Sequence, residues 1–141
     1  MKYLIDTNII SEIISKQPNQ NVLDFFNTLD SKNLYLSVIT IGELKYGIDR
    51  LPDSKRKTQL NKWFETLLIK YQPNIIDIDI ETMIIWSNIN KQTKEKGITL
   101  TIMDSLIASS ALNHNLILVT RNIKDFYHIK NITLLNPFEG L

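Results

Sequence analysis

The 141-residue chain contains no cysteine, and only four glycines and four prolines. Without cysteine it forms no disulfide, thiolate metal site or cysteine nucleophile. So few glycines and prolines argue against long flexible linkers. No apolar run approaches the roughly 18 residues that span a bilayer, and the N-terminus lacks the pattern of a signal peptide. We therefore expect one cytoplasmic domain, residues 1–141, with no membrane partner.

The overall charge gives little indication of a partner. The formal net charge is +1, with 43% hydrophobic and 22% charged residues, as in an ordinary globular protein. Bulk electrostatics therefore do not require a nucleic-acid partner. One local exception is the basic start of a predicted helix over residues 55–71, which is either a solvated face or a phosphate-backbone contact.

The first ten residues predict a strand followed directly by a helix. Residues 3–5 form a short apolar run typical of a buried strand, and isoleucines at 9, 10, 13 and 14 recur at helical spacing. Asp6, Thr7 and Asn8 lie between them. Asp6 is thus expected at the carboxyl end of a parallel strand, where open α/β sheets bind ligands. Simple capping of the helix is the alternative for Asp6 or Asn8.

A second strand, predicted over residues 34–38, carries another acidic residue to the same edge. Thr40 and Glu43 have the spacing of a capping box, which predicts a helix starting at Thr40. Glu43 would then lie in the first turn of a helix that follows a strand. Capping and a role beside Asp6 both remain open for Glu43.

Further elements follow as alternating strands and helices. A weak strand is expected over 75–78, then a helix that Asp79 caps and that ends near Gly97. We expect the apolar residues of these helices to lie in the core, including Tyr46, Trp63, Ile80, Met83, Ile84 and Ile89.

The last third of the chain repeats the strand-to-polar pattern. Thr101 and Asp104 have N-terminal cap spacing at the start of a helix. A buried strand at 116–119 runs into Thr120, Arg121 and Asn122, and a short strand is expected at 132–135. This alternation predicts an α/β fold of three layers.

The acidic residues at these strand ends suggest a metal site. Asp6, Glu43, Asp104 and the segment with Asn122 and Asp125 are expected near one sheet edge. Carboxylates so close together raise one another's pKa, and a hard cation relieves the repulsion. Without cysteine or histidine ligands, such a cluster favours Mg²⁺ or Mn²⁺ over zinc. Sites of this kind hydrolyse phosphodiesters.

An ordered set of motifs resembles the PIN-domain ribonuclease toxins of the VapC type, close to their FitB-like branch. The resemblance covers nearly the whole chain. The matching segments are Leu4-Ile5-Asp6-Thr7-Asn8-Ile9-Ile10-Ser11-Glu12, Leu36-Ser37-Val38-Ile39-Thr40-Ile41-Gly42-Glu43-Leu44 with Gly47, Asp104 with Ile107-Ala108, Val119-Thr120-Arg121-Asn122 with Asp125-Phe126, and Asn136-Pro137-Phe138.

The resemblance implies a PIN-like α/β/α fold, a five-stranded parallel sheet of order 3-2-1-4-5 with helices on both faces. It also implies a Mg²⁺-dependent endoribonuclease that forms a homodimer and cleaves RNA, with Mn²⁺ able to substitute. A cognate VapB-like antitoxin would block the site and supply the DNA-binding part of a repressor complex. One departure is Asn122, where many family members have a fourth acidic residue.

Roles for the acidic residues follow from this resemblance. Asp6 and Asp104 are expected as direct metal ligands, and Glu43 as a ligand or as the residue that orients the attacking water. Asn122 and Asp125 are expected to hold metal-bound waters. The alternative for this pair is that Asn122 caps a short helix with Asp125 in its first turn.

Four other polar residues are expected to support the site. Thr7, Asn8 and Thr120 would hydrogen-bond the Asp6 carboxylate or a metal-bound water. Arg121 would contact an RNA phosphate, unless it is simply an exposed arginine.

Other function classes fit less well. A haloacid-dehalogenase phosphatase needs a second Asp where Asn8 stands, and a receiver domain needs a late Lys directly after a strand, which Lys124 is not. A metal-free ribonuclease needs two histidines as acid and base, but His114 and His128 lie in polar loops. A catalytically weak PIN scaffold that acts mainly as an antitoxin-bound co-repressor remains open; loss of RNA cleavage in Asp6→Ala would exclude it.

Overall fold

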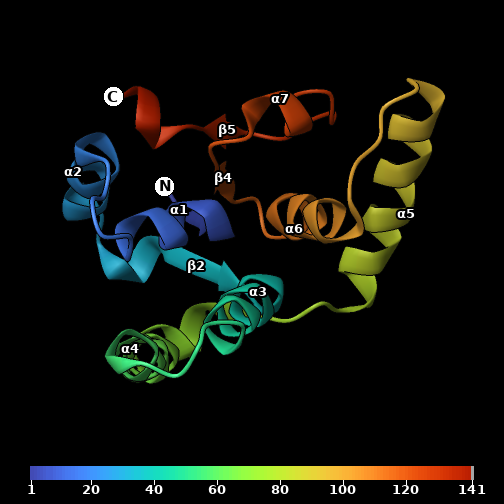
Figure 1. Cartoon of the computed structure of the whole chain (residues 1–141). Helices are drawn as coiled ribbons and strands as arrows, with labels where there is room; N and C mark the ends of the chain where they lie inside the picture. The colour runs from blue at the N-terminus through green and yellow to red at the C-terminus, as the bar shows by residue number, and fades with distance from the viewer. Residues whose placement is uncertain (141) are drawn as a thin grey trace.

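A computed structural model describes residues 1–140 and contains one five-stranded parallel sheet. The strand order is β3-β2-β1-β4-β5, as predicted, and β1 lies at the centre. Figure 1 shows β2, β4 and β5 between the helices. Their bounds are β1 Tyr3–Ile5, β2 Leu34–Ser37, β3 Ile75–Ile76, β4 Ile117–Val119 and β5 Leu134–Leu135.

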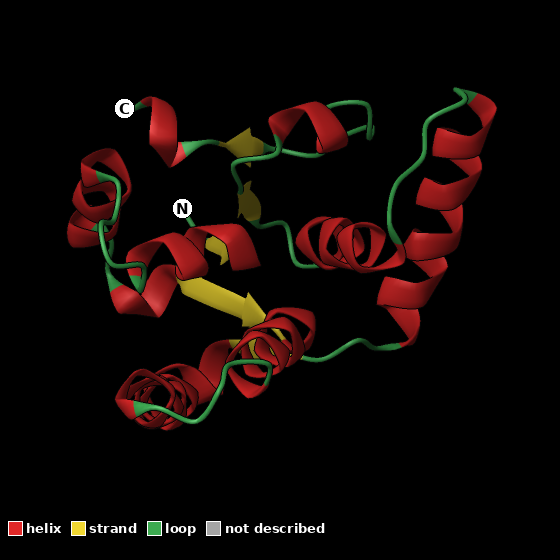
Figure 2. Cartoon of the chain, in the orientation of Figure 1, coloured by secondary structure: helices red, strands yellow, loops and turns green. Residues whose placement is uncertain are grey.

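Seven α-helices account for most of the regular structure described, as the colouring of Figure 2 shows. Their bounds are α1 Thr7–Ile13, α2 Gln20–Thr28, α3 Val38–Asp49, α4 Lys55–Tyr71, α5 Ile80–Glu95, α6 Ile102–Asn113 and α7 Ile123–Phe126. The amphipathic helix predicted for 55–71 is confirmed by α4. Among residues 1–140, no helix is both long and apolar enough to cross a membrane.

The central strand divides the core into two hydrophobic clusters. Neighbouring residues on a strand point to opposite faces, so Ile5 packs with residues of α1 to α4, while Leu4 packs with residues of α5, α6 and α7. Both side chains are fully buried. Helices therefore cover both faces of the sheet, which confirms the three-layer prediction.

The start of α3 differs from the prediction. The helix begins at Val38, and Ser37 Oγ caps it by accepting a hydrogen bond from the Ile39 N–H at 3.0 Å. Thr40 is the third residue of the helix and is buried, so the capping box of Thr40 and Glu43 is wrong. Ser37 ends β2 and is an equally good cap three residues earlier, which moves Glu43 into the second turn.

Several apolar residues assigned to the core are exposed instead. Ile80 is 79% exposed, Ile84 59% and Tyr46 65%, and Met83 is also exposed, whereas Ile89 is buried as predicted. In α5 the buried positions are Thr82, Ile89 and Thr93, so these define the side that packs on α6. Ile80 and Ile84, four residues apart, share a different, uncovered side.

Candidate active site

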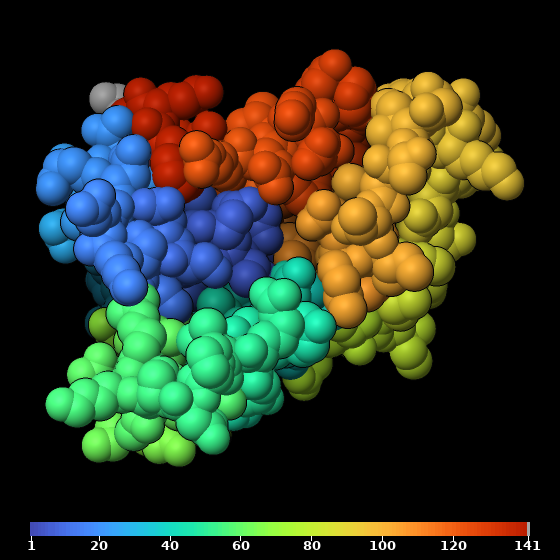
Figure 3. Space-filling model, viewed as in Figure 1, coloured from blue at the N-terminus to red at the C-terminus, as the bar shows by residue number. Residues whose placement is uncertain are grey.

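A cavity of about 470 Å³ lies beside the carboxyl end of β1. It is bounded by α1, α3 and α6, which are coloured blue, teal and orange in Figure 3 and meet in that view. Its lining is polar, and three of the residues are the acids that the sequence indicated. The lining residues are Asp6, Thr7, Asn8, Ser11, Glu12, Glu43, Asp104 and Asn122.

Asp6 links the sheet to this cavity. Its backbone N–H donates to the Val119 carbonyl at 2.9 Å and so extends the pairing of β1 with β4. Its side chain is the N-cap of α1, because Oδ1 accepts the Thr7 N–H at 2.8 Å. The other oxygen, Oδ2, accepts Thr120 Oγ1–H at 2.8 Å and Asn8 Nδ2–H at 3.2 Å. Asp6 therefore both caps α1 and lines the cavity.

The environment of Asp6 opposes its ionisation. Only 4% of the residue is exposed, and this burial raises the pKa of Asp6 to about 6. Hydrogen bonds from Thr120 and Thr7 lower the pKa, while the negative charges of Asp104 and Glu43 raise it further. A buried carboxyl in a cavity with other carboxylates is the environment in which a bound cation has the largest effect.

Glu43 reaches the same cavity from α3. Its Oε1 accepts a hydrogen bond from Thr7 Oγ1 at 2.6 Å, and the Thr7 oxygen lies 3.1 Å from Thr40 Oγ1. The Thr7 hydroxyl is thus directed to Glu43, and Thr7 bonds Asp6 through its backbone instead. All three residues expected to hydrogen-bond the Asp6 carboxylate therefore do so, Thr7 through its backbone N–H and Asn8 and Thr120 through their side chains.

Asp104 comes from the first turn of α6. Its backbone N–H donates to Thr101 Oγ1 at 3.2 Å, which confirms Thr101 as the helix cap. Partial burial raises the pKa of the Asp104 carboxyl, a hydrogen bond with Thr101 lowers it, and the charges of Glu43 and Asp125 raise it. Asp104 lines the cavity together with residues of α1.

Asn122 and Asp125 differ in their relation to the cavity. Asn122 lines it and stands at the N-cap position of α7, but its side chain makes no capping hydrogen bond. Its backbone N–H donates to Thr120 Oγ1 at 3.1 Å. Asp125 is absent from the lining, although its charge acts on Asp104. The structure therefore brings Asn122 into the lining of the cavity with the acids, and Asp125 is not part of that lining.

Arg121 is exposed and does not line the cavity. Its backbone N–H donates to Asn8 Oδ1 at 3.2 Å, and its guanidinium lies 4.4 Å from the centre of the Phe138 ring. The two histidines lie outside the lining as well, as the sequence indicated.

Two lining residues were not singled out from the sequence. Ser11 and Glu12 follow Thr7 and Asn8 by four residues on α1, so helical spacing alone would have placed them on the cavity side. Glu12 also has a structural role, because its Oε2 accepts the Asn19 N–H at 2.8 Å in the turn before α2.

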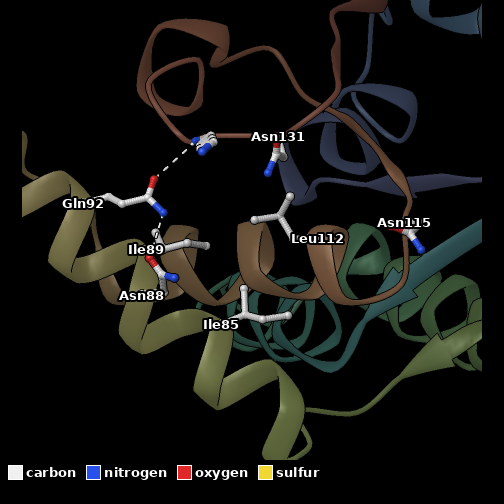
Figure 4. A pocket seen from close by; sticks show the side chains of 8 residues that line it. Ile85, Asn88, Ile89, Gln92, Leu112, Asn115 and Asn131 are labelled. Atoms are coloured by element: carbon white, nitrogen blue, oxygen red, sulfur yellow. Dashed lines mark hydrogen bonds between the residues drawn. The ribbon is translucent and has the colours of Figure 1, made fainter.

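A larger cavity of about 660 Å³ has a different character (Figure 4). It is lined from α5, α6 and the loops around β4 and β5, and none of its lining residues is acidic. Gln92 donates to Asn88 and accepts the Lys130 N–H there. Two more of its amides, Asn115 and Asn131, occupy positive-φ turns at 53° and 70°, a conformation that asparagine tolerates well. Its residues are thus explained by local structure, and the smaller acidic cavity is the candidate site.

The acidic cavity offers hard oxygen donors without nitrogen or sulfur ligands. Among the residues described, no group of three or more His, Asp or Glu side chains is close enough to surround a single ion in this conformation. Mg²⁺ usually takes one or two carboxylates and completes its shell with water and substrate phosphate. Two direct carboxylates therefore fit this site better than a closed cage of protein ligands.

Comparisons with known proteins agree with this arrangement. The model of the PIN domain family matches residues 3–132. The chain is 32% identical to toxin FitB of Neisseria gonorrhoeae over 136 residues, which cover 96% of this chain and 97% of the relative. It is 34% identical to ribonuclease VapC2 of Rickettsia felis, with coverage of 96% and 98%.

Solved structures agree with the sequence comparisons. The crystal structure of FitAcB from Neisseria gonorrhoeae superimposes with a TM-score of 0.91 at 31% identity, covering 96% of this chain and 98% of the other. VapBC2 of Rickettsia felis, bound to a promoter DNA fragment, gives 0.82 at 33% identity with the same coverage. With its matching sheet order and its acidic cavity at the end of β1, the chain belongs to the PIN domain family, among the toxins of the VapC and FitB type.

Proposed function

We propose that this protein is the toxin of a type II toxin–antitoxin pair and a metal-dependent endoribonuclease that hydrolyses RNA phosphodiester bonds. The observation that carries the proposal is one cavity lined by Asp6, Glu43 and Asp104, in a chain similar over nearly its full length to VapC ribonucleases. With RNA as its substrate, the protein is expected to act in the cytoplasm.

PIN nucleases generally depend on a divalent metal, and we assign Mg²⁺ to this site, with Mn²⁺ as a substitute. The hard oxygen donors favour these ions. The raised pKa of both Asp6 and Asp104 means that a cation would stabilise their ionised forms. Asp6 and Asp104 would hold the ion directly, and Glu43 either joins them or orients the attacking water.

When bound, the cation polarises the scissile phosphate and lowers the pKa of the attacking water. The side chains that line the cavity orient the water and bind the phosphate. If Glu43 is not a metal ligand, its carboxylate, held at one oxygen by Thr7, would accept a hydrogen bond from that water and orient it. The neutral amide of Asn122 donates to a phosphate oxygen or accepts from a water. Asp125 would act on the site through its charge on Asp104, and the exposed Arg121 would contact a neighbouring phosphate.

A VapB-like antitoxin is the expected partner, because related structures include complexes named FitAB and VapBC bound to DNA. An apolar groove of about 330 Å³ lies between α1, α2 and α4. Its lining includes Ile10, Ile13, Phe26 and Trp63, with Trp63 only partly buried. We assign this groove to an apolar segment of the antitoxin, with a basic side chain of the same segment entering the acidic cavity. The complex would bind its promoter DNA through the antitoxin.

Purified protein incubated with total RNA tests the proposal. Cleavage should require Mg²⁺ or Mn²⁺, stop with EDTA, and stop again when the antitoxin is added. Mapping of the cut ends identifies the cleaved sequence. Cleavage that continues in EDTA would contradict a metal-dependent mechanism. A chain that binds antitoxin and promoter DNA but cuts no RNA would be the co-repressor scaffold instead.

A further inference from the structure

The buried hydroxyl of Thr40 has an unusual partner. Thr40 lies in α3 and only 1% of it is exposed. Its Oγ1 lies 3.1 Å from Thr7 Oγ1 at the start of α1, and within residues 1–140 it makes no other side-chain hydrogen bond. A buried hydroxyl that bonds across to a neighbouring helix fixes the two side chains relative to each other.

Other hydroxyls inside helices of this protein behave differently. A threonine or serine within a helix commonly donates to a carbonyl three or four residues earlier on the same helix. Thr40 does not, whereas seven other residues in the helices described do: Thr28, Thr58, Thr66, Thr93, Ser105, Ser109 and Ser110. The proton of Thr40 is therefore available to Thr7.

The number of hydroxyl protons decides which residue donates in the hydrogen bond between Thr40 and Thr7. An ionised Glu43 can only accept, so the Thr7 hydroxyl donates to it across 2.6 Å. Thr7 has a single hydroxyl proton, and that bond uses it. The 3.1 Å contact is then donated by Thr40 to Thr7. The three side chains form one chain of donors running from Thr40 through Thr7 to Glu43.

We infer that Thr40 is a positioning residue for the proposed cleavage reaction, on which this inference rests. Glu43 is exposed and has three rotatable side-chain bonds, so without a fixed donor its carboxylate samples many positions. Thr40 holds Thr7 in one rotamer, and Thr7 fixes Glu43 Oε1 at the cavity. Oε2 has no hydrogen-bond partner among residues 1–140 and remains available to a ligand or a water.

Substitutions at Thr40 separate the effect of its hydroxyl group from the effect of its side-chain volume. Thr40→Val removes the hydroxyl at nearly constant volume, and Thr40→Ser keeps it. We expect Thr40→Val to lower kcat about fivefold with KM nearly unchanged, since one neutral hydrogen bond is lost. Thr40→Ser should recover most of the rate. Thr93→Val is the matched control, because Thr93 is a buried helical threonine bonded within its own helix.

A double substitution tests whether Thr40 acts through Thr7. Thr40→Val added to Thr7→Val should cause no further loss of kcat, because the chain is already broken. Losses that multiply in the double variant, or a Thr93→Val variant that loses as much as Thr40→Val, would overturn the inference in favour of a general packing effect.

The rotamer of Thr7 can be measured without any activity. Three-bond NMR couplings to the Thr7 methyl carbon should report one χ1 rotamer in the wild type and in Thr40→Ser, and averaged values in Thr40→Val. A single rotamer retained in Thr40→Val would overturn the inference. If the wild type cuts no RNA, the proposed function fails, but these couplings still decide whether Thr40 positions Thr7.

Discussion

Asp6 makes the metal-free fold pH-dependent. Its pKa is about 6 in the folded chain against an ordinary 3.8, so between these values the folded state binds more protons than the unfolded state. The free energy of unfolding therefore falls as pH rises through this range, by about 3 kcal/mol in total. The cost is absent below pH 4 and fully present above pH 6.

Replacing Asp6 with asparagine should remove this cost. Because an amide does not ionise, Asp6→Asn should raise the metal-free melting temperature at pH 7 by several degrees and leave it nearly unchanged at pH 4. The wild type should gain stability with Mn²⁺, about 2.7 kcal/mol at a hundredfold excess over Kd, and Asp6→Asn should lose most of that gain. Thermal melts at both pH values measure this; equal responses to Mn²⁺ would exclude Asp6 as a ligand.

Asp125 should act through the pKa of Asp104. Its negative charge raises that pKa, so Asp125→Asn should lower it and extend cleavage activity to more acidic pH. The position of the acidic limb of the pH–rate profile measures the effect. Asn122→Ala is the comparison, because it removes a lining side chain without a charge. An acidic limb that stays in place in Asp125→Asn would show that the two carboxylates do not interact.

Helix α3 depends on the residue that ends β2. Ser37→Ala removes the cap of α3 and should lower the free energy of unfolding by about 1 kcal/mol. For a chain of this size that corresponds to a melting temperature about 2–4 °C lower. Thr40→Ser should have a much smaller effect, since Thr40 does not cap the helix. An unchanged melting temperature in Ser37→Ala would show that Ser37 does not contribute measurably as the cap of α3.

Ser37 and Thr40 also show how far the structure could be predicted from the sequence. Periodicity predicted α4 with its bounds, and the apolar run at residues 3–5 predicted β1 and the place of Asp6. Ser37 and Thr40 are equally suitable caps, so only the end of β2 decides between them. For the site, Asp6, Glu43 and Asp104 were predicted from their positions after strands or near the starts of helices. The separation of Asn122 from Asp125 depended on the geometry of a four-residue helix, which no periodicity specifies.

Exposed apolar residues on α5 show a similar limit of prediction from the sequence. They also suggest where two copies of the chain could meet. Ile80 and Ile84 have core-like spacing, but no element of the described chain covers them. Whether a spaced pair is buried within one chain or between two copies depends on tertiary structure, which spacing alone does not give. The resemblance to VapC-type toxins implies a homodimer, and we expect the two copies to meet at this uncovered side of α5.

A single charge on this surface should separate the copies. Ile84→Lys should convert the dimer to a monomer while the fold stays intact, because the side chain is already more than half exposed. Ile69→Lys, at an exposed position of α4, is the control and should leave the dimer unchanged. Sedimentation equilibrium gives the masses. A wild-type mass of one chain, or an unaffected Ile84→Lys dimer, would contradict this interface.

The metal-dependent cleavage of RNA by the acidic cavity is tested most directly by removing one charge from it. Asp104→Asn should reduce Mg²⁺-dependent RNA cleavage at least tenfold, about 1.4 kcal/mol or more in the barrier. Asp79→Asn is the matched control, because Asp79 is an exposed acid that caps α5 outside the cavity, and asparagine caps equally well. A fall in rate confined to Asp104→Asn is the predicted result. A wild-type rate in Asp104→Asn would contradict the assignment of this cavity as the active site.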